Sequence, residues 1–260
     1  MGGTVGKSLA LLDCLAAVQD DIGLSELARA LNFDKATTLR LLTPMVTHGM
    51  VEKLAHSRRY RLGPMVLRLA RKREATVTFP QSAGPILKSL SAAVQESCHL
   101  TEPAEMEMIS SIVVNSDRAI RVQLVAGQRI PLHCTASGLA YLAFGPRAVL
   151  DRVLAAPLPA LTPNTCTTPE AVLREVSATM ARGYAFNCGA FDIETCSVAA
   201  PILDGTGLAK GALSIAAPTT RIDEHGLQRL ADSVVAAAHE ITRTIFGSLS
   251  HSSHSSRSSR

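Results

Sequence analysis

Residues 34–47, with the sequence DKATTLRLLTPMVT, decide the fold of the N-terminal region. Their apolar residues recur at intervals of three and four, which predicts an amphipathic helix. The side chains expected on its core face are Leu39, Leu42 and Val46. Asp34 precedes this helix as an N-cap, because its carboxylate can accept hydrogen bonds from the free N–H groups of the first turn. Pro44 removes one hydrogen bond from a helix interior, so we expect a bend or an end near Thr43.

The segments on either side of this helix complete a small domain. An apolar period of three to four residues predicts a helix over residues 7–18 and a short second helix over 25–31. The second and third helices are then joined by a tight turn. Further along, residues 48–54 and 59–62 flank a short polar loop, which is typical of two short strands. A helix pair followed by a hairpin is the order of elements in a winged helix-turn-helix.

The charge of the chain is concentrated in this N-terminal region. Residues 1–75 hold 12 Lys and Arg against 7 Asp and Glu, a net charge of +5, whereas the remainder holds 14 against 15, a net charge of −1. In a winged helix-turn-helix the second helix of the pair enters the major groove of DNA. The side chains that we expect to face DNA, from that helix and the tip of the hairpin, are Lys35, Thr37, Thr38, Arg40, Arg58 and Arg59. The alternative is that the cations lie on a solvated face and the threonines are surface or capping residues.

Composition excludes several classes of protein. The chain has 260 residues, 47% of them apolar, enough for one or two domains with a substantial core. It has no apolar run of the roughly 20 residues that span a bilayer, and its start lacks the pattern of a signal peptide. Six scattered cysteines without a C-x-x-C pair fit a reducing cytoplasm better than a disulfide framework. We therefore expect a cytoplasmic protein with no membrane contact.

The rest of the chain mixes helices and strands. The expected helices lie at residues 80–97, 139–144, 169–180 and 227–245. The expected strands lie at residues 108–114, 120–125, 197–203 and 211–216. Small residues in 132–138 come just before one of these helices, whose first N–H groups have no internal partner and can bind a carboxylate. The fold class expected from this order is α+β with a mainly antiparallel sheet.

Nine short motifs, spread in order along the chain, point to one family. They are residues 6–12 (GKSLALL), 24–29 (LSELAR), 35–42 (KATTLRLL), 49–52 (GMVE), 60–63 (YRLG), 131–138 (PLHCTASG), 182–186 (RGYAF), 199–201 (AAP) and 212–218 (ALSIAAP). Together they resemble the IclR family of bacterial transcriptional regulators. The resemblance covers nearly the whole chain, apart from residues 248–260.

This resemblance implies a domain organisation and an assembly. A winged helix-turn-helix would occupy residues 1–63, a connecting helix and linker 64–79, and an effector-binding domain similar to GAF or PAS folds 80–247. Residues 248–260 are rich in Ser, His and Arg, and we expect this tail to be disordered. The family also implies dimers or tetramers on double-stranded operator DNA.

The resemblance further implies the positions of an effector site. The residues that match the family's ligand pocket are Ala136, Ser137, Asn187, Ser197, Ser214 and Ala216. They offer hydroxyls, one amide and backbone N–H groups without a fixed charge, which favours a small organic acid, carboxylate or aromatic. The alternatives are that Ser137 is a helix cap and that Asn187 and Ser197 are ordinary turn and strand residues.

The hypothesis that follows is a ligand-responsive, DNA-binding transcriptional regulator. One alternative is a small-molecule sensor that acts through protein partners. Another is an enzyme using Cys134, but adjacent residues of a strand point to opposite faces, so His133 is poorly placed to activate that thiol. A zinc site built from His133, Cys134, Cys188 and Cys196 has no recognised ligand spacing. We expect no catalytic residue, no metal and no cofactor.

Overall fold

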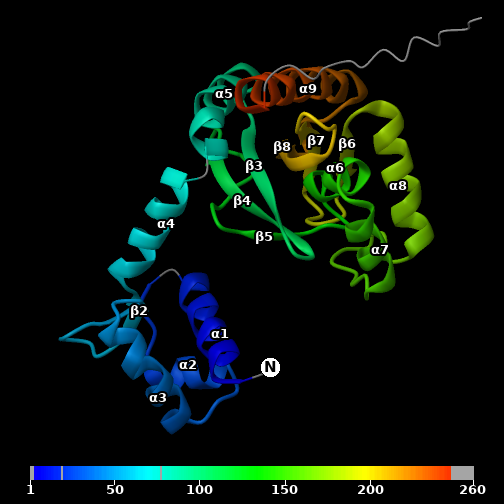
Figure 1. Cartoon of the computed structure of the whole chain (residues 1–260). Helices are drawn as coiled ribbons and strands as arrows, with labels where there is room; N and C mark the ends of the chain where they lie inside the picture. Colours follow the sequence, from blue (N-terminus) through cyan, green and yellow to red (C-terminus); the bar gives the residue numbers. More distant parts are fainter. Residues whose placement is uncertain (1–2, 19, 77, 247–260) are drawn as a thin grey trace, which may run out of the picture. The chain divides into compact units, whose positions relative to one another are not determined.

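The computed structural model describes residues 3–18, 20–76 and 78–246 of the chain (Figure 1). The chain divides into two units, the first ending at residue 77 and the second beginning at residue 78. The tail predicted at residues 248–260 lies outside the described residues.

The first unit is a winged helix-turn-helix. Its elements are α1 (Gly3–Ala17), α2 (Leu24–Ala30), α3 (Lys35–Thr47), β1 (Val51–Lys53), β2 (Tyr60–Leu62) and α4 (Pro64–Thr76). The two strands pair antiparallel, with Val51 opposite Leu62. Side chains from α1, α2, α3 and both strands form one hydrophobic core, in which Leu11, Leu27 and Leu42 are fully buried. The predicted helix pair and hairpin are therefore confirmed.

Helix α3 differs from its prediction in phase and in length. Its core face consists of Thr38, Leu41, Leu42 and Met45. Two of the three predicted core residues, Leu39 and Val46, are 45% and 36% exposed. The helix also continues through Pro44 to Thr47 rather than ending at Thr43. Because Pro44 is exposed, the carbonyl that loses its amide partner one turn earlier lies on the solvent side, where water can satisfy it.

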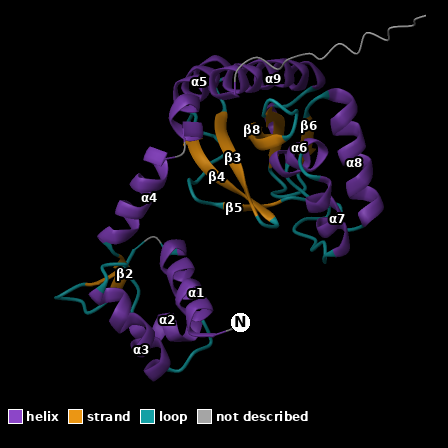
Figure 2. Cartoon of the chain, in the orientation of Figure 1, coloured by secondary structure: helices purple, strands orange, loops and turns teal. Residues whose placement is uncertain are grey.

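The second unit is a single antiparallel sheet with helices on both faces (Figure 2). Its strands are β3 (Ser97–Ala104), β4 (Glu107–Val114), β5 (Arg129–Pro131), β6 (Ala185–Cys188), β7 (Thr195–Leu203) and β8 (Ala209–Pro218). They lie in the order β5-β4-β3-β8-β7-β6, and every neighbouring pair is antiparallel. The predicted α+β class with an antiparallel sheet is confirmed.

The helices of this unit pack in two groups. They are α5 (Thr78–Val94), α6 (Ala136–Phe144), α7 (Arg147–Ala155), α8 (Pro169–Arg182) and α9 (Glu224–Phe246). Helices α5 and α9 lie side by side on one face of the sheet, as Figure 1 shows. Helix α6 packs on the other face, over β6, β7 and β8, with α7 and α8 against it. A hydrophobic core of the unit lies between α6, with α7 and α8, and the sheet.

One predicted strand of this unit is wrong. Residues 120–125 form an irregular segment, in which Ile120 and Val125 are 74% and 55% exposed. Side chains of the surrounding fold hold the segment in place: Ser97 Oγ donates to the carbonyl of Val122 at 2.7 Å, and Asn115 Nδ2 donates to the carbonyl of Leu124 at 3.1 Å. The alternation of apolar residues in this segment therefore does not mark one face of a sheet. The segment lies between solvent and the cavity described below.

Candidate nucleic-acid interface and ligand cavity

The first two turns of α3 carry two exposed cations and one half-buried hydroxyl. Asp34 Oδ1 accepts a hydrogen bond from the Thr37 N–H at 2.7 Å, which confirms Asp34 as the N-cap. This bond lowers the pKa of the Asp34 carboxyl. Lys35 and Arg40 are exposed, Thr37 is half-buried, and neither cation forms an ion pair among the described residues. Both charges on this helix are therefore available to an anionic partner.

Thr38 must be removed from the predicted DNA-facing set. Its side chain is fully buried, and its hydroxyl donates to the carbonyl of Asp34 at 2.9 Å. The cause is the phase of α3, which places Thr38 on the core face with Leu41 and Leu42. The sequence reasoning also missed exposed residues of the same helix, and correcting its phase recovers them. They are Ala36, Leu39, Thr43, Val46 and Thr47.

The two arginines of the hairpin have different environments. Arg58 is exposed, at a backbone φ of 55°, in the loop between β1 and β2. Arg59 immediately precedes β2. Its guanidinium contacts the Asp21 carboxylate, donates to the Asp21 carbonyl and pairs with Glu26 Oε2 at 2.9 Å. The hydrogen bond to Asp21 raises the pKa of the Arg59 guanidinium above its ordinary value. Arg58 stays a predicted DNA contact, whereas Arg59 joins the hairpin to the turn before α2 and to α2 itself.

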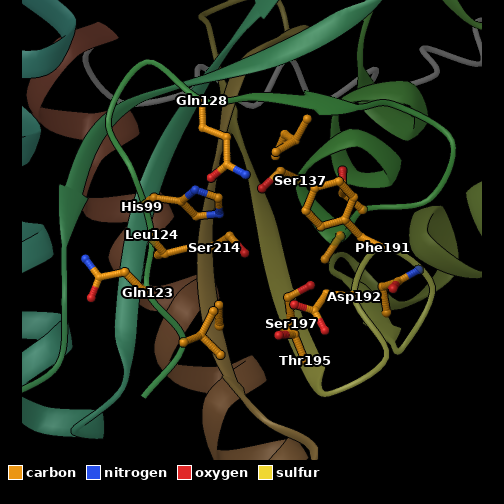
Figure 3. A pocket seen from close by; sticks show the side chains of 16 residues that line it. His99, Gln123, Leu124, Gln128, Ser137, Phe191, Asp192, Thr195, Ser197 and Ser214 are labelled. Atoms are coloured by element: carbon orange, nitrogen blue, oxygen red, sulfur yellow. The ribbon is translucent and has the colours of Figure 1, made fainter. Parts of the chain in front are cut away.

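The second unit contains a cavity of about 130 Å³ beside the N-terminus of α6. All six positions predicted for the effector site line it. Their role as ligand contacts stays a prediction. Figure 3 shows Ser137, Ser214 and Phe191 around the same space. The lining residues that the sequence reasoning missed are His99, Val122, Gln123, Leu124, Gln128, Ile130, Thr135, Phe191, Asp192 and Thr195.

The cavity holds hydrogen-bonding groups that lack partners. The hydroxyls of Ser137 and Ser214 are buried and make no hydrogen bond among the described residues. Thr135 caps α6 by accepting from the Gly138 N–H at 3.0 Å, and it also donates to the Pro131 carbonyl at 2.7 Å. The N–H groups of Ala136 and Ser137 belong to the first helical turn, where an α-helix offers no internal acceptor. The Ser137 and Ser214 hydroxyls and the first N–H groups of α6 are therefore the donors that the cavity offers to a ligand.

His99 on β3 adds a neutral ring to this lining. Its Nδ1 lies 2.9 Å from Ser110 Oγ, and burial lowers the pKa of His99 to about 4. The lining has no Lys or Arg among the described residues, and its one carboxylate, Asp192, accepts from the Glu194 N–H at 2.9 Å. The cavity is therefore almost free of formal charge near neutral pH. No sequence motif indicated His99.

The residues considered for catalysis or zinc binding are engaged in other contacts. His133 Nε2 lies 3.2 Å from the carbonyl of Pro159, and burial raises the pKa of the Cys134 thiol to about 12. Cys188 and Cys196 are joined by a disulfide. Within the described ranges, no three His, Cys, Asp or Glu residues are grouped as a metal site would require. Nor does any helix in those ranges have the length and apolar character needed to cross a membrane.

Comparison with known proteins gives consistent matches over both units. Residues 4–55 match the model of the IclR helix-turn-helix domain, and residues 75–243 match the model of the bacterial transcriptional regulator IclR C-terminal domain. The probable transcriptional regulator SauR of Cupriavidus necator is 29% identical over 92% of this chain and 95% of its own length. Among solved structures, an IclR-type transcriptional regulator from Silicibacter sp. TM1040 is 37% identical, with a TM-score of 0.80 over 95% of this chain and 97% of that one. An IclR homologue from Microbacterium hydrocarbonoxydans, complexed with 4-hydroxybenzoate, shares the fold at 24% identity, with a TM-score of 0.77 over 93% and 99% of the two chains.

Proposed function

The chain belongs to the IclR family of bacterial transcriptional regulators, and from this premise we propose that it binds operator DNA through α3 and the β1–β2 hairpin under the control of a small organic acid. It is a DNA-binding transcriptional regulator with an effector-binding domain. We place its action in the cytoplasm, as a homodimer or homotetramer. Light scattering of the full chain tests the assembly, and a monomer at micromolar concentration would contradict it.

The exposed side of α3 is the observation that carries the DNA-binding proposal. Lys35, Thr37 and Arg40 are accessible there, and Arg58 is accessible on the hairpin. Cations without ion pairs within the described residues can displace the counterions of a duplex, which makes affinity fall steeply with salt concentration. Hydroxyls and an arginine on a helix in the major groove can also contact base edges.

A salt titration of DNA binding tests this assignment. The full chain is titrated onto the promoter region upstream of its own gene at several salt concentrations. Replacing Arg40 or Arg58 with Ala should weaken binding and, for each phosphate that the variant no longer neutralises, reduce the slope of log affinity against log salt by about 0.9. The control is Arg174→Ala, which removes the same charge from the exposed side of α8. Equal behaviour of all three variants would refute the assignment.

The size and lining of the cavity support a one-ring or short-chain acid as effector. Its volume of about 130 Å³ is close to that of an engineered cavity of roughly 150 Å³ that binds benzene. A carboxylate beside the first turn of α6 would accept from the N–H groups of that turn and from the Ser137 hydroxyl. Phe191 offers an apolar surface for a ring or alkyl chain. A homologue of this fold is complexed with 4-hydroxybenzoate, which makes that compound a reasonable first probe.

A thermal-shift screen of small carboxylic acids, starting with benzoate and 4-hydroxybenzoate, tests the effector proposal. A bound acid raises the melting temperature, and the same acid should change the affinity of the protein for its promoter DNA. Ser137→Ala should abolish both effects, whereas Ser177→Ala, at an exposed position of α8, should preserve them. An acid that binds equally well to Ser137→Ala would place the effector elsewhere.

A further inference from the structure

The pair formed by Cys188 and Cys196 stands at the base of the loop that carries part of the cavity lining. The two residues face each other across β6 and β7, with their Cα atoms 4.0 Å apart, and their side chains are bonded. Between them runs the loop of residues 189–195, which contributes Phe191, Asp192 and Thr195 to the cavity. Asn187 and Ser197, also in the lining, are the immediate neighbours of the two cysteines along the chain.

The environment of this pair differs from that of Cys98, Cys134 and Cys166, the other cysteines of the second unit. Cys188 is exposed, so a small oxidant or reductant in solution can reach its sulfur, whereas Cys196 is buried beside it. Cys98 and Cys134 are buried, and burial raises the pKa of each thiol to about 12. The pKa of the half-buried Cys166 thiol is also raised by burial. The thiolate is the reactive form of cysteine, so these three are poor reactants near neutral pH.

We propose that Cys188 and Cys196 form a reversible thiol–disulfide site that exchanges with small disulfides such as oxidised glutathione and holds the 189–195 loop more tightly when oxidised. Disulfides in the cytoplasm of most bacteria are transient or redox-sensing rather than structural. The pair is therefore a dithiol under reducing conditions. Neither the exchange nor the tightening of the loop depends on the proposed function.

The exchange balances in two steps. The thiolate of Cys188 attacks one sulfur of oxidised glutathione, a mixed disulfide forms, and the first glutathione thiolate leaves and takes up a proton. The sulfur of Cys196, after losing its proton to solvent, attacks the Cys188 sulfur of that mixed disulfide and displaces the second glutathione. Two cysteine thiols are oxidised and one glutathione disulfide is reduced to two thiols. Excess reduced glutathione reverses both steps.

The expected effect on the loop follows from chain entropy. A bond between residues 188 and 196 restricts the open conformations of the short segment between them. Other contacts hold the two ends of that segment in either redox state and leave its middle to the cysteine pair. The Thr162 and Thr165 hydroxyls donate to the carbonyls of Gly189 and Ala190, and the Thr219 N–H donates to the carbonyl of Glu194 at 2.8 Å. Asp192 and Glu194, farther along, are exposed and accessible to a protease that cleaves after acidic residues.

The test compares the full chain after treatment with dithiothreitol and after treatment with excess oxidised glutathione. We expect oxidation to remove two of six alkylatable thiols without adding mass from glutathione. Digestion of the denatured, alkylated protein with Glu-C, which cleaves after Glu194, should then release peptides that stay linked until reduction. In the native protein, Glu-C cleavage after Glu194 should be slower in the oxidised form by about tenfold or more.

Two variants complete the design. Cys188→Ser should give neither the linked peptides nor the difference in cleavage rate, whereas Cys14→Ser, which removes a half-buried thiol from the first unit, should keep both. The proposal is overturned if six thiols remain after oxidation, if glutathione stays attached to Cys188, or if another pair becomes linked. Linked peptides with an unchanged cleavage rate would overturn the tightening of the loop. Absence of effector binding would leave these results intact and count against the proposed function alone.

Discussion

Protonation of His99 should destabilise the second unit below neutral pH, and His99→Gln should remove that effect. The imidazole is buried, and its pKa is lowered to about 4 by loss of hydration, against an ordinary value near 6.5. Between these values the unfolded chain binds a proton that the folded chain excludes. The free energy of unfolding therefore falls as the pH falls from about 6.5 to about 4, and this contribution is fully present only above that range.

The size of the effect follows from the two pKa values. Linkage gives a loss of about 2 kcal/mol at pH 5 relative to pH 7.5, approaching about 3 kcal/mol below pH 4. Asp192 is the one carboxylate among the described residues that line the cavity with His99. Its charge would raise the pKa of His99 if the two side chains came close, which would reduce the loss. Burial is the only cause of the lowered pKa of His99, so the structure favours the full loss of unfolding free energy rather than a reduced one.

Urea unfolding followed by circular dichroism at pH 5 and pH 7.5 measures this difference. Gln can keep one hydrogen bond to Ser110 without titrating, so His99→Gln should be less sensitive to pH than the parent protein. Burial also lowers the pKa of His133, but that residue is present in both proteins and its contribution cancels. A pH dependence that is the same in both proteins, to within about 0.5 kcal/mol, would show that His99 is hydrated and that the inferred neutral cavity is incorrect.

Three further substitutions test the helices that position the two sites. Thr38→Val should leave operator affinity unchanged and cost about 1 kcal/mol in urea unfolding, because it removes a buried hydroxyl that contacts only the protein. Thr135→Ala removes the cap of α6 and its bond to Pro131, which should lower unfolding free energy by about 1–2 kcal/mol. Gly138→Ala would place a methyl carbon 2.3 Å from the carbonyl oxygen of Leu132, so α6 must shift. We expect that variant to lose the thermal shift produced by an effector acid. An unchanged shift would mean that binding of the acid does not depend on the position of α6.

Local periodicity predicted the existence of α3 but not its orientation. Leu39, Leu41, Leu42, Met45 and Val46 are all apolar, so two helical faces fit the same segment, and both include Leu42. The choice between them depends on packing against α1, α2 and β1, which no local pattern contains. Capping was more predictable, since the bond from Asp34 to the first turn involves residues only three positions apart.

The lining of the cavity likewise includes residues that could be predicted from the sequence and residues that could not. Positions within recognisable motifs, such as Ser137 and Ser214, could be identified from the sequence, and they meet in one cavity. The irregular segment that contributes Val122 and Leu124 could not, because its course depends on hydrogen bonds from Ser97 and Asn115 rather than on a repeating backbone pattern. His99 was also missed, since its register opposite Ser214 becomes visible only when β3 and β8 are paired.

The absence of cations from the described lining of the cavity, whose one carboxylate is Asp192, gives its hydrogen-bond donors an unusual weight in selecting a ligand. A charged acid must lose most of its hydration to enter, and within the described lining no Lys or Arg compensates for that loss. Compensation must come from fixed dipoles, namely the first N–H groups of α6 and the unpaired hydroxyls of Ser137 and Ser214. These donors are directional and already desolvated. An acid of the right shape forms hydrogen bonds with them, whereas an acid that is displaced by about an ångström leaves them unpaired. Selectivity in such a site therefore depends on the precise position of α6, which Thr135 and the close contact of Gly138 with Leu132 determine.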